Sequence, residues 1–311
     1  MNNTAKKGRL TVLGAVAIGA VVALAGCSSS DPLSSGSDDT ASSSDALVIG
    51  SQQYYSNKII AELYAQALED GGYTVDRQYD IGQREVYLPE LESGSIDVFP
   101  EYSGNLLQFY DAETTAKTPE EVESALADAL PDGLTSLTAA EATDQDSYNV
   151  TKEFSEENGI TSLADLKDYS GSIALGAPPE NVDRPYGPPG LKSIYGVDVT
   201  STPIDDGGGP LTAKALSDGS VQIADLYSAS PLIVENDFVT LDDPENMILP
   251  QNVVPIVSDK VDQGAQDIID AVDAALTSAD LQEMNSKSQT DKESSATIAK
   301  DYLTEKGLLD S

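Results

Sequence analysis

The sequence contains no histidine, a single cysteine and few basic residues. Without histidine, Ser-His-Asp and Cys-His nucleophilic catalysis and the commonest zinc ligands are excluded. Because Cys27 is the only cysteine, neither an intramolecular disulfide nor a cysteine-based metal cluster is possible. Hydrolysis by a pair of carboxylates remains, but among 53 acidic residues such pairs arise by chance. We therefore expect no enzyme, no metal and no cofactor.

The scarcity of basic residues gives the chain a net charge of −36. Nucleic acid and anionic lipid headgroups are therefore not expected as partners. A field of this sign favours cationic solutes. The alternative, that the acidic surface serves only solubility, stays open at this point.

The N-terminal segment has the plan of an export signal. Lys6, Lys7 and Arg9 precede an apolar run over residues 10–25, which is shorter than the roughly 20 residues that span a bilayer. The sequence Leu-Ala-Gly-Cys that ends at Cys27 resembles a bacterial lipobox. We expect residues 1–26 to be a lipoprotein signal peptide and Cys27 to be acylated, anchoring the chain at the extracytoplasmic face of the cell membrane. No second long apolar segment follows, so the chain is not itself a permease.

Residues 27–45 are mostly Ser, Asp, Gly and Thr and predict a disordered tether. From Ala46 onward, short apolar strands alternate with amphipathic helices, a pattern typical of α/β folds with parallel sheets. The pattern starts again near Tyr148. The expected division is a first part of lobe 1 over residues 46–147, lobe 2 over residues 148–252, and a return to lobe 1 over residues 253–311.

The stretch over residues 96–104 carries the first candidate for a ligand contact. A strand is expected to stop at Pro100, which has no amide to donate. Ser103 is expected to cap the helix that follows. Tyr102 then lies at the carboxyl end of a strand beside a helix N-terminus, where open α/β sheets bind ligands. The alternative is a tyrosine that only covers the edge of a core.

Two other motifs do not favour a function. The glycine-rich run over residues 205–210 lacks the Gly-Lys-Ser/Thr ending of a phosphate loop, so it predicts a turn before a helix. The acidic pairs Asp144/Asp146 and Asp242/Asp243 do not have the spacing of an EF-hand calcium loop.

Several motifs together resemble the substrate-binding lipoproteins of ABC transporters for osmoprotectants such as glycine betaine, choline and carnitine. They are Ile-Gly-Ser at residues 49–51, Gly-Gln-Arg-Glu-Val at 82–86, Pro-Glu-Tyr-Ser-Gly at 100–104, Arg-Pro at 184–185, Gly-Leu-Lys at 190–192 and Lys-Ala-Leu at 214–216. The resemblance covers nearly all of residues 46–309. It implies the two-lobe α/β fold of type II periplasmic binding proteins, with a ligand cleft between the lobes.

The resemblance also implies a site for a quaternary ammonium solute. Such a group donates no hydrogen bonds, so it is held by the faces of aromatic rings. An arginine binds the solute's carboxylate, although in so acidic a protein a structural ion pair is the alternative role. The candidate ligand-binding residues are the rings Tyr102, Tyr148 and Tyr227, the arginine Arg184, and the amides Gln52, Asn105 and Asn252.

Two positions depart from the family's pattern. Gln52 stands where a lysine is frequent, and Gln251 and Asn252 stand where many members have a fourth tyrosine. Tyr54, Tyr55 and Tyr186 are candidates for the missing ring. A more polar cleft favours carnitine-like or other substituted betaines, including heteroaromatic ones, at least as much as glycine betaine.

The sequence therefore predicts a lipid-anchored receptor that passes a small quaternary ammonium or zwitterionic solute to an ABC transporter permease. The alternatives from other classes are a secreted hydrolase with a carboxylate pair and an adhesin or cell-wall interaction module.

Overall fold

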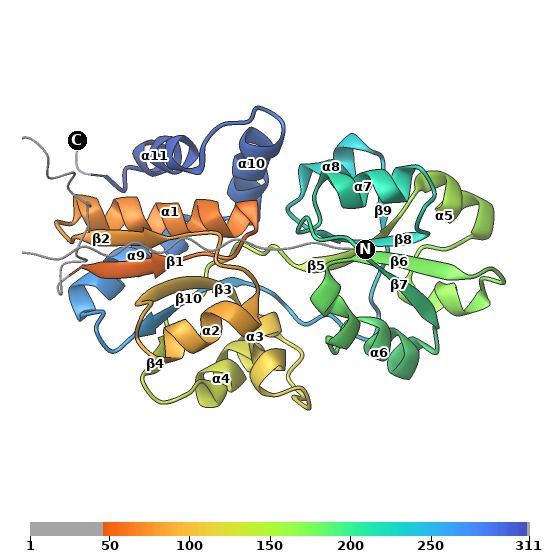
Figure 1. The fold of residues 1–311 in the computed structure, drawn as a ribbon, viewed down its shortest axis with the longest axis horizontal. Helices are drawn as coiled ribbons and strands as arrows, with labels where there is room; N and C mark the ends of the chain where they lie inside the picture. Colours follow the sequence, from red (N-terminus) through yellow and green to blue (C-terminus); the bar gives the residue numbers. More distant parts are fainter. Residues whose placement is uncertain (1–45, 310–311) are drawn as a thin grey trace, which may run out of the picture. The chain divides into compact units, whose positions relative to one another are not determined.

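The computed structural model of this protein describes residues 46–309, which belong to one compact unit. The expected signal peptide, the acylation site Cys27 and the tether lie outside the described residues. Within them are two five-stranded sheets, each with helices on both faces (Figure 1). We call the parts built on these sheets the first and the second lobe. No helix of the described part is both long and apolar enough to cross a membrane.

The first sheet has the strand order β2-β1-β3-β10-β4. Strands β2 and β3 run parallel to β1, whereas β10 runs antiparallel to β3 and β4, so the sheet is mixed rather than parallel as expected. The chain reaches β10 from the second lobe and enters the sheet in the opposite direction. The strands are β1 (Leu47–Gly50), β2 (Val75–Gln78), β3 (Val98–Tyr102), β4 (Leu134–Ser136) and β10 (Val253–Ser258).

Two separate cores cover the two faces of this sheet because side chains alternate along its strands. Leu47 and Ile49 pack with α1, α9, α10 and α11, whereas Val48 packs with α2, α3 and α4. Helix α1 ends at Asp70 before Gly72, whose positive φ favours glycine. The helices are α1 (Tyr55–Asp70), α2 (Arg84–Glu92), α3 (Ser103–Tyr110), α4 (Pro119–Ala129), α9 (Gln263–Ala275), α10 (Ser278–Gln289) and α11 (Ser295–Lys306).

The second sheet has the strand order β7-β6-β8-β5-β9, with β5 antiparallel to its neighbours β8 and β9. Its strands are β5 (Asp146–Val150), β6 (Ile173–Ala177), β7 (Val199–Pro203), β8 (Ile223–Tyr227) and β9 (Val239–Thr240). Its helical segments are α5 (Lys152–Asn158), η1 (Leu163–Asp168), η2 (Pro179–Asp183), α6 (Pro188–Gly190), η3 (Leu191–Tyr195), α7 (Pro210–Ser217) and α8 (Pro231–Glu235).

Strand β3 continues through Pro100 to Tyr102, so the expectation that Pro100 ends the strand is wrong. Pro100 pairs with Pro255 of β10, and the Asn57 side chain donates to the Pro100 carbonyl at 2.8 Å. The two prolines, which have no amide hydrogen to donate, therefore lie opposite each other in the sheet. Ser103 does not cap α3, because its hydroxyl donates to the Pro250 carbonyl at 3.2 Å. Tyr102 nevertheless lies where β3 meets α3.

Candidate ligand-binding site

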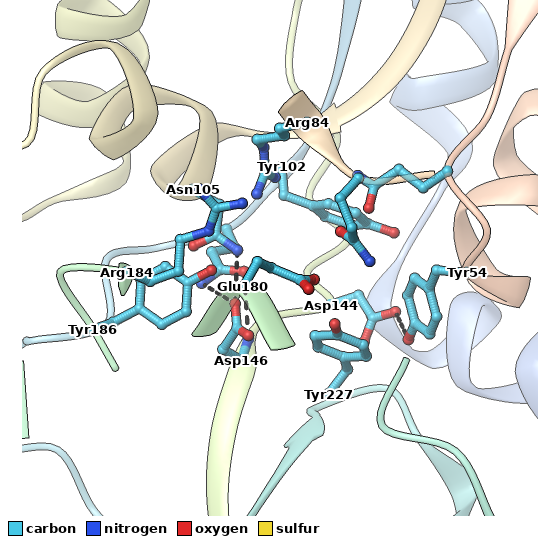
Figure 2. A pocket seen from close by; sticks show the side chains of 13 residues that line it. Tyr54, Arg84, Tyr102, Asn105, Asp144, Asp146, Glu180, Arg184, Tyr186 and Tyr227 are labelled. Carbon is cyan, nitrogen blue, oxygen red and sulfur yellow. Dashed lines mark hydrogen bonds between the residues drawn. The ribbon is translucent and has the colours of Figure 1, made fainter. Parts of the chain in front are cut away.

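Side chains from both lobes and from the chain crossings between them line one cavity (Figure 2). The centre of a water molecule can reach only about 30 Å³ of it, which is room for about two waters. The side chains are thus closed around the cavity. They are Gln52, Tyr54, Gln83, Arg84, Tyr102, Asn105, Asp144, Asp146, Glu180, Arg184, Tyr186, Tyr227 and Gln251.

A buried ion pair between Arg84 and Glu101 supports the first-lobe wall of the cavity. The guanidinium donates through Nε at 3.0 Å and through Nη2 at 2.7 Å, a two-point contact. The Tyr87 hydroxyl also donates to Glu101, and Gln52 donates to the Tyr87 oxygen at 3.3 Å. Glu101 accepts from the Tyr102 amide at 2.9 Å as well. The network fixes Tyr102 and compensates the charge of Arg84.

Four tyrosine rings reach the cavity from different parts of the chain. Tyr54 precedes α1 and Tyr102 ends β3, whereas Tyr186 precedes α6 and Tyr227 ends β8. The centroids of the Tyr54 and Tyr227 rings are 4.5 Å apart, so the two lobes are in contact here. The buried Tyr102 hydroxyl has no hydrogen-bond partner. The rings form an aromatic wall with polar edges.

Three carboxylates line the same cavity, and none forms an ion pair with a lysine or arginine of residues 46–309. Asp144 accepts from the Tyr54 hydroxyl at 2.6 Å and from the Ala229 amide at 3.0 Å. Asp146 accepts from the amides of Asn105 at 2.6 Å and Gln251 at 3.0 Å. Asp144 and Asp146 therefore accept hydrogen bonds from neutral donors, whereas the positive charge of Arg184 acts on Glu180 and opposes the effect of burial on its pKa.

Burial changes the protonation of these acids because it penalises their charged form. It raises the pKa of Asp144 from 3.8 to about 6, with hydrogen bonds from Tyr54 and Ala229 opposing the shift. Burial also raises the pKa of Glu180. Asp225 lies behind the cavity on β8, and burial together with the Asp146 charge raises its pKa. The two arginines that line the cavity, Arg84 and Arg184, are paired with Glu101 and Glu85 rather than with these acids.

Arg184 lies at the cavity and also forms an ion pair with the first lobe. Its side chain lines the cavity and is 13% exposed, while its Nη2 atom lies 2.9 Å from Glu85 of the first lobe. Its guanidinium carbon is 5.7 Å from the centroid of the Phe109 ring. The Nε atom is buried without a hydrogen-bond partner. One donor of Arg184 is therefore free for a further acceptor.

The structure brings five of the seven predicted contact residues together around the cavity: Gln52, Tyr102, Asn105, Arg184 and Tyr227. Tyr148 lies outside it, because it is two residues deeper along β5 than Asp146 and its hydroxyl donates to the Tyr186 carbonyl at 2.7 Å. Asn252 is also outside and donates to the Ala140 carbonyl at 2.9 Å.

Sequence reasoning did not propose the acids of the cavity as contacts, and of the pair Gln251 and Asn252 it proposed Asn252, whereas Gln251 is the one that lines the cavity. Asp144 and Asp146 were considered only as a calcium motif, yet both lie where the chain enters β5. Their position at a crossing between lobes was the signal that could have identified them. Among residues 46–309, no group of three or more His, Cys, Asp or Glu side chains is placed to hold a metal ion.

Residues 45–305 match the sequence profile of the substrate-binding domain of ABC-type glycine betaine transport systems. The glycine betaine-binding protein YehZ of Escherichia coli (strain K12) is 26% identical over 277 residues, which cover 83% of this chain and 90% of that protein. A similar crystal structure, that of a glycine betaine/carnitine/choline ABC transporter, has a TM-score of 0.68 at 19% identity and covers 85% of this chain and 100% of that one.

Lactococcal OpuAC in its closed-liganded conformation with glycine betaine has a TM-score of 0.62 at 13% identity, and the match covers 85% of this chain and 96% of that one. These likenesses confirm the α/β fold of type II periplasmic binding proteins. The relatives are solute-binding proteins, so the hydrolase alternative is set aside. Because the matching profile spans most of the chain, this protein belongs to the family of substrate-binding domains of ABC-type glycine betaine transport systems.

Proposed function

We propose that this protein is the lipid-anchored receptor of an ABC importer and that it binds a quaternary ammonium osmoprotectant of the betaine type. The observation that carries the proposal is the combination of four tyrosine rings with the carboxylates of Asp144 and Asp146, which form no ion pair with a lysine or arginine of the described residues. A buried carboxylate without a cation is costly. A cationic ligand removes that cost.

A quaternary ammonium group suits this cavity better than an ammonium with hydrogens. Each ring face contributes roughly 0.5 to 2 kcal/mol to holding the cation, depending on desolvation. Asp144 and Asp146 already accept hydrogen bonds from Tyr54, Asn105 and Gln251, so they supply charge more than hydrogen-bond acceptors. The proposed cage consists of Tyr54, Tyr102, Tyr186 and Tyr227.

The carboxylate end of the ligand is assigned to Arg184. Its Nε atom is buried without a partner, and an anion placed there satisfies it. Gln52, Gln83 and Gln251 add polar groups to the cavity, which favours substituted betaines such as carnitine at least as much as glycine betaine. Choline has no carboxylate, so we expect it to bind more weakly than either.

Isothermal titration calorimetry of the purified protein against glycine betaine, carnitine and choline tests the proposal. We expect stoichiometric binding without turnover and choline as the weakest ligand. An Arg184→Ala variant is expected to lose affinity for the betaines but not for choline. If choline is the tightest ligand, or if the variant binds betaines normally, the role given to Arg184 is wrong.

Anchoring through Cys27 is the other part of the proposal. It rests on the charged and apolar leader and on the Leu-Ala-Gly-Cys sequence. Phase partitioning in detergent tests it, and the wild-type protein is expected in the detergent phase. A Cys27→Ser variant is expected to keep residues 1–26, so its chain should be heavier than the wild-type chain. Recovery of the wild-type protein only in the aqueous phase would contradict acylation.

A further inference from the structure

A second cavity adjoins the first one. The centre of a water molecule can reach about 240 Å³ of it, far more than in the first cavity. Asn105, Arg184 and Tyr186 line both cavities, so the two are neighbours that share these walls. The second cavity lies between α3 of the first lobe and the loop before α6 of the second lobe.

The walls of the second cavity hold three buried polar atoms that have no hydrogen-bond partner. They are the Nε donor of Arg184 and the side-chain oxygens of Asn105 and Gln108. Buried polar groups in native proteins are nearly always paired, so three such atoms around one space indicate that something polar occupies it. Because the Nε donor of Arg184 is assigned to the ligand's carboxylate, the two oxygens of Asn105 and Gln108 remain for the branch, and they match a group that donates, such as a hydroxyl or an amide N–H.

The same cavity also has an apolar side. Phe109 is 37% exposed and its ring lies under the Arg184 guanidinium, and Ala112 lies in the turn after α3. Flat apolar surface beside unpaired polar atoms suits a short carbon chain that bears a polar group.

We propose that the second cavity is a subsite for a polar side branch of the same ligand. This inference rests on the proposed function and names its solute class: betaines that carry a hydroxyl or amide branch, rather than glycine betaine alone. The ammonium group lies among the tyrosines, the carboxylate meets Arg184, and the branch enters the space between Gln108 and Phe109.

The test fills the second cavity without touching the first. Ala112 is exposed and lines only the second cavity, so Ala112→Phe narrows it while the tyrosine cage stays intact. Ala127 of α4 is also exposed and lines neither cavity, so Ala127→Phe is the matched control. The dissociation constants of glycine betaine, carnitine and O-acetylcarnitine are measured by calorimetry for both variants and for the wild-type chain.

We expect Ala112→Phe to weaken binding of the branched solutes about tenfold and to leave glycine betaine within about twofold of wild type. A Gln108→Leu variant is expected to weaken carnitine by about tenfold or less, because it removes the acceptor for the carnitine hydroxyl, and to leave O-acetylcarnitine, which has no donor on its branch, nearly unchanged. The Ala127→Phe control is expected to change none of the three constants.

The outcomes separate the subsite from the proposed function. If glycine betaine binds but Ala112→Phe affects all three solutes equally or none of them, the subsite is overturned and the function stands. If no solute binds the wild-type chain, the proposed function fails and the subsite fails with it.

Discussion

At the scale of single residues, the cage can be tested ring by ring. Replacing Tyr102 or Tyr227 with alanine is expected to weaken binding of a quaternary ammonium ligand by roughly 1 to 2 kcal/mol each, because one ring face is lost. Phenylalanine keeps the face, so Tyr→Phe is expected to cost less at both positions.

Tyr148→Phe is the matched comparison, because Tyr148 lies in the core of the second lobe and its hydroxyl donates to Tyr186. It is expected to affect stability more than affinity. Affinities measured by calorimetry that stay unchanged in both alanine variants would falsify the cage.

Asp144 makes binding dependent on pH. Its pKa is about 6 when the lobes are in contact and no cation is bound, and a bound cation favours the charged carboxylate. At pH 5 only about one tenth of Asp144 is charged, so affinity is expected to fall about tenfold between pH 7 and pH 5. Asp144→Asn should flatten this dependence in titrations over the same range. A variant with the wild-type pH profile would assign the effect to another group.

The same residue has the opposite effect on folding. Because the folded-state pKa lies above the ordinary value of 3.8, the stabilisation from protonating Asp144 is fully present below that value and is lost as pH rises through about 6. Asp144 therefore makes the ligand-free protein less stable at neutral pH, where it binds cations best. The negative charge that attracts the ligand therefore lowers the folding stability when no ligand is bound.

At the scale of elements, the Arg84–Glu101 pair joins α2 to β3 in the buried wall of the site. A Glu101→Gln variant leaves the Arg84 charge buried without compensation and is expected to lower the free energy of unfolding by about 3 to 5 kcal/mol. Denaturant unfolding measures this. The exposed pair Lys192–Asp198 is the control, and Lys192→Gln is expected to leave the midpoint nearly unchanged. If Glu101→Gln and Lys192→Gln lowered the free energy of unfolding equally, burial of the ion pair would not determine its contribution to stability.

Local patterns were enough to predict most elements, because hydrophobic periodicity reports which face of a strand or helix is buried. They also placed Tyr102 and Tyr227 at strand ends that reach the cavity. They did not distinguish Gln251 from Asn252. Which of these two side chains faces the cavity depends on how the chain crosses between the lobes and on the pairing of the next strand, β10, with β3. These contacts are non-local.

Local sequence patterns also did not predict that β3 continues past Pro100 to Tyr102. A proline is tolerated there because Pro255, far away in the sequence, lies opposite it. The burial of Asp144 likewise depends on Tyr54 from a distant segment. Propensity describes a residue in isolation, whereas these positions depend on their partners.

At the scale of the whole molecule, the small free volume around the tyrosines means that a betaine cannot enter while the lobes are in contact. Tyr54 meets Tyr227, Gln53 donates to Asp205 at 3.1 Å, and Arg184 pairs with Glu85. We expect the lobes to separate for ligand entry and to close around the ligand.

Small-angle X-ray scattering measures this motion. The radius of gyration of the ligand-free protein in solution is expected to fall when a saturating betaine is added. A Tyr102→Ala variant is expected to need more ligand for the same decrease. An unchanged radius of gyration at a ligand concentration that calorimetry shows to be saturating would contradict closure.

The position of β10 in the first sheet also bears on the order in which the two lobes can fold. β10 lies between β3 and β4 and is followed by α9, which packs on α1 with α11. All strands of the second lobe precede it in the chain. As the chain is made from its N-terminus, all of the second lobe is available before the first lobe is complete, and until then the first sheet keeps an unpaired strand edge and an uncovered apolar face. Until the last segments arrive, the half-finished first lobe is the part of the molecule that most needs a chaperone.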